Sequence, residues 1–129
     1  MIRLEWKEEK KLVKGIFDEK KELDRKVPII KKDGNRRLEK HHTAIIEKHR
    51  QLESNIEDCF SALEKQDRKI IILSYVEGLT NYKLAEALNV SERTVATYKR
   101  NATINFASTY KLLHLSFIFI TILFNMAVR

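Results

Sequence analysis

The sequence predicts an all-α protein, on three observations. The chain of 129 residues has only three glycines and one proline, so it offers few points at which a helix must stop. Its apolar residues recur at helical spacing, and few runs alternate with the period of two that is typical of strands. The length suffices for one domain, or one small domain with an appendage, but not for two independent cores.

The first segment, residues 1–36, is expected to form an amphipathic helix over 4–26 and then a connector. Apolar residues recur there with a helical period, separated by charged residues: Leu12, Val13, Ile16, Phe17 and Leu23. Val27 precedes Pro28 and is therefore biased away from helical backbone angles, and an Asp-Gly-Asn turn sequence follows. We therefore expect residues 27–36 to be a connector.

Residues 37–63 are expected to form one long helix with a heptad seam. The seam residues follow alternating steps of four and three: Leu38, His42, Ile45, His49, Leu52, Ile56, Cys59 and Leu63. Such a seam joins two copies of a chain in a coiled coil or packs against the chain's own helices. Because two seam positions are histidine, we favour packing within the chain and keep a homodimer as the alternative.

No metal and no cofactor are predicted. The available ligands are His41, His42, His49 and Cys59, but His42 and His49 stand two helical turns apart, whereas local metal-binding pairs usually sit closer. The single cysteine excludes an internal disulfide and is typical of a reducing cytosol. The charged start of the chain lacks the apolar stretch of a signal peptide, so we expect a cytoplasmic protein.

Residues 64–111 carry the pattern of a helix-turn-helix. A supporting helix over 67–76 is expected to end at Gly78, because glycine readily takes the left-handed conformation that stops a helix. Thr80 offers its hydroxyl as the cap of a short helix over 81–88.

The turn and the second helix of the motif follow. Asn89 tolerates the left-handed conformation and stands where such turns normally carry glycine. Ser91 is expected to cap the next helix. The two helices are expected to share a core of Leu84, Ala85, Leu88, Val90, Val95 and Tyr98. An ordinary pair of antiparallel helices with similar packing is the alternative.

If Val95, Tyr98 and Ala102 face inward, the outer side of this helix is the candidate contact surface for double-stranded DNA. We call it the reading face, and its residues are Ser91, Glu92, Arg93, Ala96, Thr97, Lys99 and Arg100. Lys99 and Arg100 are expected to bind phosphates, and the helix start at Ser91 to present backbone N–H groups to a phosphate.

The other residues of the reading face suit base contacts in the major groove. Arg93 can donate two hydrogen bonds to guanine, and Glu92 can accept one from the amino group of cytosine. Ala96 and Thr97 can contact a thymine methyl group. The charge balance agrees, since 25 Lys and Arg against 18 Asp and Glu give a net charge of +7, which suits a polyanion.

No enzyme is predicted. The sequence has no glycine-rich phosphate loop, no paired carboxylates on a rigid frame, and no nucleophile with a base at recognisable spacing.

The run Leu73–Val95, LSYVEGLTNYKLAEALNVSERTV, resembles the fourth region of bacterial sigma factors, which grips promoter DNA. The continuation Asn105–Tyr110 is similar to the Phe-Ala-x-x-Tyr ending of ArpU-like phage transcriptional regulators. The resemblance implies a regulator of phage or prophage late genes that reads DNA with residues 91–100 and has RNA polymerase as a candidate partner. Asn89 in place of glycine and the tail over 112–129 depart from the family.

Residues 112–128 contain no charged side chain and form an apolar tail. A helix of this length spans about 25 Å, at the short limit for a bilayer. His114 and Asn125 disfavour insertion. We favour an aberrant or self-packing extension and keep membrane attachment as the alternative.

The sequence therefore predicts a sequence-specific regulator that binds double-stranded DNA. Two other functions stay open: the DNA-recognition small subunit of a phage packaging terminase, which would assemble as a ring, and a membrane-tethered regulator.

Overall fold

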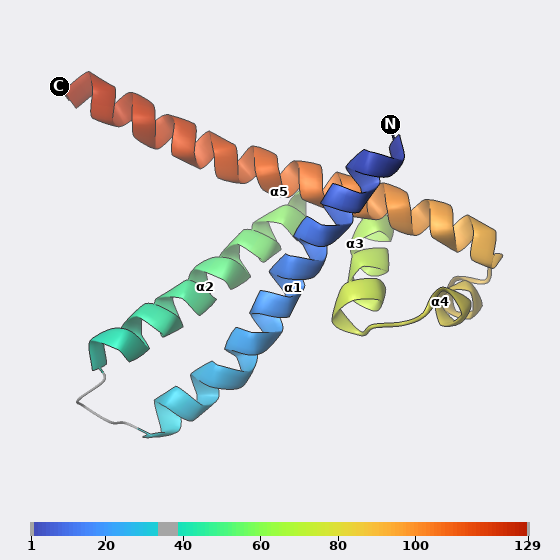
Figure 1. Cartoon of the computed structure of the whole chain (residues 1–129), viewed down its shortest axis with the longest axis horizontal. Coiled ribbons are helices and arrows are strands. Elements are labelled where there is room, and N and C mark those ends of the chain that lie inside the picture. Colours follow the sequence, from blue (N-terminus) through green and yellow to red (C-terminus); the bar gives the residue numbers. More distant parts are fainter. Residues whose placement is uncertain (1, 34–38, 129) are drawn as a thin grey trace.

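The computed structural model describes residues 2–33 and 39–128, and every element in these ranges is helical. The elements are, in chain order, α1 (Ile2–Asp33), α2 (Glu39–Ala62), α3 (Lys65–Ile71), the π-helix η2 (Ile72–Val76), α4 (Asn81–Leu88) and α5 (Glu92–Val128). In Figure 1, α1 and α2 form an antiparallel pair that α5 crosses near the start of α1 and the end of α2. The prediction of an all-α protein is confirmed.

Helix α1 continues through Pro28, so the predicted connector is wrong for residues 27–33. The rest of it, residues 34–36, lies outside the described residues. An interior proline costs a helix about 3 kcal/mol, because it lacks an N–H and its ring crowds the preceding turn. Val27, the residue that Pro28 biases away from helical angles, is only 5% exposed and lies one turn after the buried Leu23, so packing keeps it in the helix. Burying such a side chain is worth about 1.5–3 kcal/mol, which is of the same size as the cost of the proline.

The heptad seam of α2 packs within the chain. Its second half is buried: Leu52, Ile56, Cys59 and Leu63. The earlier seam residues His42, Ile45 and His49 are half-buried, and Leu38 lies outside the described residues. The four buried residues belong to the main core of the chain, and a homodimer through the rest of the seam stays a prediction.

A cluster of aromatic rings joins α5 to α1, α2 and η2. The ring of Phe106 lies 5.5 Å from that of Phe17 on α1 and 5.6 Å from that of Phe60 on α2. The Phe17 ring also lies 6.1 Å from that of Tyr75 on η2. Ring pairs at such distances add about 0.5–1.5 kcal/mol to the area that they bury. The cluster holds α5 in a defined direction relative to the rest of the molecule.

Candidate nucleic-acid interface

The supporting helix of the motif has two parts. It begins at Lys65, two residues before the predicted start, and its last turn is the π-helix η2, in which the Glu77 N–H donates to the Ile72 carbonyl at 2.9 Å. It ends at Val76, two residues before Gly78, whose φ is 70°. The predicted glycine stop is confirmed, whereas nothing in the sequence indicated the wide π turn.

The predicted cap and turn of α4 are confirmed. Thr80 Oγ1 accepts a hydrogen bond from the Lys83 N–H at 3.3 Å. At the other end, Asn89 has φ 56° and ψ 47°, and its N–H points to the carbonyls of Ala85 and Glu86. The left-handed residue reverses the chain within three residues, so α5 starts directly after α4.

The start of α5 is capped by its own serine. Ser91 Oγ accepts from the Thr94 N–H at 3.1 Å, and the Ser91 hydroxyl donates to Thr94 Oγ1 at 2.9 Å. This satisfies one of the N–H groups that a helix leaves unpaired at its start. The predicted cap is confirmed.

The motif has a small core of its own, formed by Leu84, Ala85 and Val95. The residues packed around it are Leu73, Leu79, Leu88 and Val90. Tyr98, predicted to belong to this core, packs instead against the larger core of the molecule, where Ala102 is fully buried. The helix that carries the reading face is therefore anchored twice, once within the motif and once in the main core.

The reading face lies on the outside of α5, opposite these anchors. Its first residues are exposed: Ser91, Glu92, Arg93, Ala96 and Thr97. Lys99 and Arg100 are half-buried. The ammonium group of Lys99 lies 5.8 Å from the centre of the Tyr75 ring, and burial, together with the charge of Lys10, lowers the pKa of Lys99.

Three residues that the sequence analysis missed border the reading face. They line a cavity of about 390 Å³ whose walls are Trp6, Lys10, Asn81, Ala96, Thr97, Lys99 and Arg100. Trp6 and Lys10 belong to α1, more than eighty residues before the reading face, and no local pattern places them there. The one feature of the sequence that could have drawn attention to this part of α1 is its single tryptophan, which stands among charged residues.

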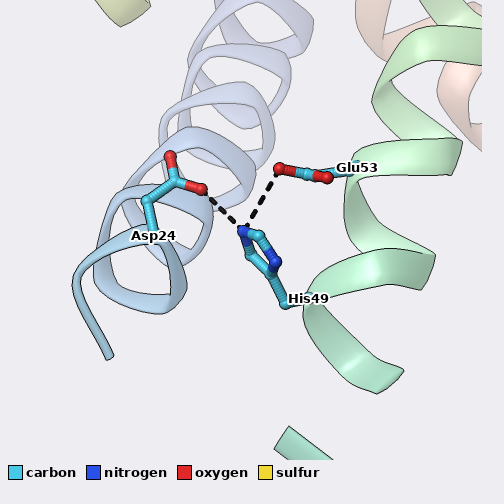
Figure 2. Close-up of side chains that lie close together, drawn as sticks. All are labelled: Asp24, His49 and Glu53. Carbon is cyan, nitrogen blue, oxygen red and sulfur yellow. Dashed lines mark hydrogen bonds and ion pairs between the residues drawn. The ribbon is translucent and has the colours of Figure 1, made fainter. Parts of the chain in front are cut away.

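The group of side chains best placed to hold a metal ion, within the described ranges, lies between α1 and α2 (Figure 2). His49 Nε2 lies 2.7 Å from Asp24 Oδ1 and 3.2 Å from Glu53 Oε1, and Lys20 Nζ lies 2.8 Å from the other oxygen of Asp24. Burial raises the pKa of Asp24, but hydrogen bonds from Lys20 and His49 outweigh it and lower that pKa. Mutual hydrogen bonding accounts for this cluster.

Cys59 is not part of that cluster. It is buried, its S–H donates to the Phe106 carbonyl at 3.4 Å, and burial raises the pKa of its thiol to about 12. A thiol with such a pKa is a poor metal ligand, since metals bind the thiolate. Of the four candidate ligands, His49 alone belongs to the cluster, and His41, His42 and Cys59 lie outside it.

Residues 53–102 match the family described as Sigma-70, region 4. The match begins in α2 and ends in α5, and it contains α3, η2, α4 and the reading face. The chain thus contains a helix-turn-helix DNA-binding domain of the sigma-70 region 4 type. The match covers less than half of the chain, and α1 and the apolar tail lie outside it.

No curated protein and no solved structure gave a match. The finer resemblance to ArpU-like regulators therefore stays a prediction. In the part of the chain that the structure describes, no helix is both long and apolar enough to cross a membrane.

Proposed function

We propose that this protein is a cytoplasmic, sequence-specific transcription regulator of a phage or prophage, without catalytic activity of its own. It inserts the first turns of α5 into the major groove of double-stranded DNA. The observation that carries the proposal is the doubly anchored α5 helix, whose free side is the exposed reading face inside the matched domain. A helix held in this way presents its side chains to DNA without a large cost in ordering.

The roles of the side chains follow from their exposure and chemistry. Arg93 is exposed and can donate two hydrogen bonds to guanine, and its neighbour Glu92 can accept one from cytosine. Ala96 and Thr97 lie one turn further and can contact a thymine methyl group. The Thr97 hydroxyl donates to the Arg93 carbonyl at 3.4 Å, so its donor is already used by the backbone and the methyl group is left for an apolar contact.

The phage or prophage role rests on the resemblance of residues 105–110 to the ending of ArpU-like regulators. In this chain Phe106 and Ala107 are fully buried and Tyr110 is half-buried, so the ending serves the packing of α5. RNA polymerase is the candidate protein partner, since the matched family belongs to a sigma factor.

The test is selection of DNA by the purified full-length protein, followed by binding measurements on Arg93→Ala at fixed salt. We expect the substitution to weaken binding to the selected site by about 1–3 kcal/mol and to relax the preference at one base pair. Arg25→Ala is the matched control, because Arg25 is an exposed arginine of α1 that does not line the cavity beside the reading face.

Equal binding by the two variants would show that the reading face is wrongly assigned, and failure to enrich any sequence would contradict sequence-specific binding. A palindromic site would indicate a homodimer. Ring-shaped particles in the same sample would favour a packaging subunit over a regulator.

A further inference from the structure

We propose that the start of α1 completes the DNA interface, by placing Lys10 beside Lys99 and Arg100 to bind one phosphate of the DNA backbone. The inference rests on the proposed DNA binding and adds a contact from outside the matched domain. We call the cavity between α1 and α5 the phosphate site, with the lining Trp6, Lys10, Asn81, Ala96, Thr97, Lys99 and Arg100.

The phosphate site is continuous with the reading face. Ala96 and Thr97 are exposed residues of that face, and the same two residues form part of the cavity wall. A duplex whose bases contact this turn of α5 therefore brings its sugar-phosphate backbone alongside the start of α1. Contacts of this kind set the register and orientation of a protein on DNA.

The charge of the phosphate site is positive and uncompensated. Three cations line it, and among its described lining residues there is no carboxylate. Instead of carboxylates, the ammonium groups contact rings: Lys10 Nζ lies 5.6 Å from the centre of the Trp6 ring, and Lys99 Nζ lies 5.8 Å from that of Tyr75. Lys10 also lowers the pKa of Lys99, so the two cations repel each other.

An anion in the cavity relieves this repulsion and gains charge-assisted hydrogen bonds from the lysines and the arginine. Trp6 and Asn81 add further N–H donors, from an indole and an amide. These groups are all hydrogen-bond donors, so the matching ligand is one that only accepts. A backbone phosphate has acceptor oxygens and no donor. The backbone of the duplex already placed on the reading face supplies such a group.

The experiment measures the salt dependence of DNA binding by the full chain, with Lys10→Gln compared with Lys21→Gln. Both residues are exposed lysines of α1, but Lys21 does not line the cavity. Losing one phosphate contact reduces the slope of log Kd against log salt concentration by about 0.9. We expect this reduction for Lys10→Gln, on the selected site and on unrelated DNA alike, and an unchanged slope for Lys21→Gln.

A second measurement uses the fluorescence of Trp6, the one tryptophan of the chain. We expect DNA to change this fluorescence in the wild type and to change it less in Lys10→Gln. Thermal unfolding of both variants checks that they are folded, which their exposed positions lead us to expect.

Equal slopes for the two lysine variants, with Arg93→Ala still impaired, would overturn this inference and leave the proposed function intact. Tighter binding by Lys10→Gln would also overturn it, and would mean that α1 shields the reading face. Inorganic phosphate tests a free ion as the occupant: a fluorescence change with that ion, without a change of slope on DNA, contradicts the proposal. If the wild type binds no DNA, both the proposed function and this inference are wrong.

Discussion

At the scale of single residues, the motif depends on a few side chains with special backbone or capping roles. Asn89 is the clearest, because it is the one residue other than glycine with a positive φ in the described part of the chain. Most residues pay roughly 1–2 kcal/mol for the left-handed conformation, whereas the short amide side chain of asparagine tolerates it. The angle between α4 and the reading face is set at this position.

Asn89→Ala should therefore destabilise the protein by about 1–2 kcal/mol, and Asn89→Gly should leave its stability close to that of the wild type. Urea unfolding of the full chain measures both. Asn101→Ala is the matched control, because Asn101 is an exposed residue of the same type within α5. If Asn89→Ala unfolds at the same urea concentration as the wild type, the turn does not need a residue that tolerates the left-handed conformation.

These local roles could be predicted from the sequence because each depends on neighbours in the chain. Thr80 and Ser91 cap the helices that directly follow them, and Gly78 and Asn89 stop the helices that directly precede them. The position of Lys10 could not be predicted in this way. Its place beside the reading face depends on how α1 packs against α5, and no local rule describes that contact.

At the scale of elements, α1 shows a local preference overruled by packing. The sequence predicts an end of the helix near Pro28, but α1 runs to Asp33 and Val27 is buried. A proline adds a cost to a helix but does not forbid it, and burial of the residue directly before the proline can offset that cost. The passage of α1 through Pro28 could not be predicted, because the burial of Val27 depends on the packing of the whole molecule.

Replacing this proline should stabilise the protein. In Pro28→Ala the new N–H can donate to the carbonyl one turn earlier, at Asp24, and the ring no longer crowds that turn. We expect a gain of about 2 kcal/mol, which is less than the full cost of an interior proline because the unfolded chain also becomes more flexible.

The measurement is the midpoint of thermal or urea unfolding. Lys31→Ala, an exposed residue in the same part of α1, serves as the comparison and should change stability by only a few tenths of a kcal/mol. A Pro28→Ala variant less stable than the wild type would indicate that the helix ends at the proline.

At the scale of the whole molecule, the helices packed around the main core, which we call the body, carry an apolar extension. The last turns of α5 extend beyond the other helices (Figure 1), and their described large apolar side chains are exposed: Ile122, Leu123, Phe124 and Met126. Contiguous apolar surface of this kind favours association. The sequence predicted the apolar tail but not that it would continue α5 without a break.

Removal of the chain after His114 should therefore leave the stability of the body unchanged to within about 0.5 kcal/mol and reduce self-association. Urea unfolding and sedimentation, with the full chain as the reference, measure the two effects. A large loss of stability in the shortened protein would mean that the tail packs on the body.

The continuity of α5 has a consequence for orientation. One helix of 37 residues connects the reading face to the apolar end, over a length of about 55 Å. An α-helix turns by about 100° for each residue. The directions in which the reading face and the apolar end point around the helix axis are therefore fixed relative to each other. One residue inserted between them would rotate one against the other by about 100°, and seven would restore the phase to about 20°. Whatever holds the apolar end thereby also sets the direction in which the protein faces its DNA.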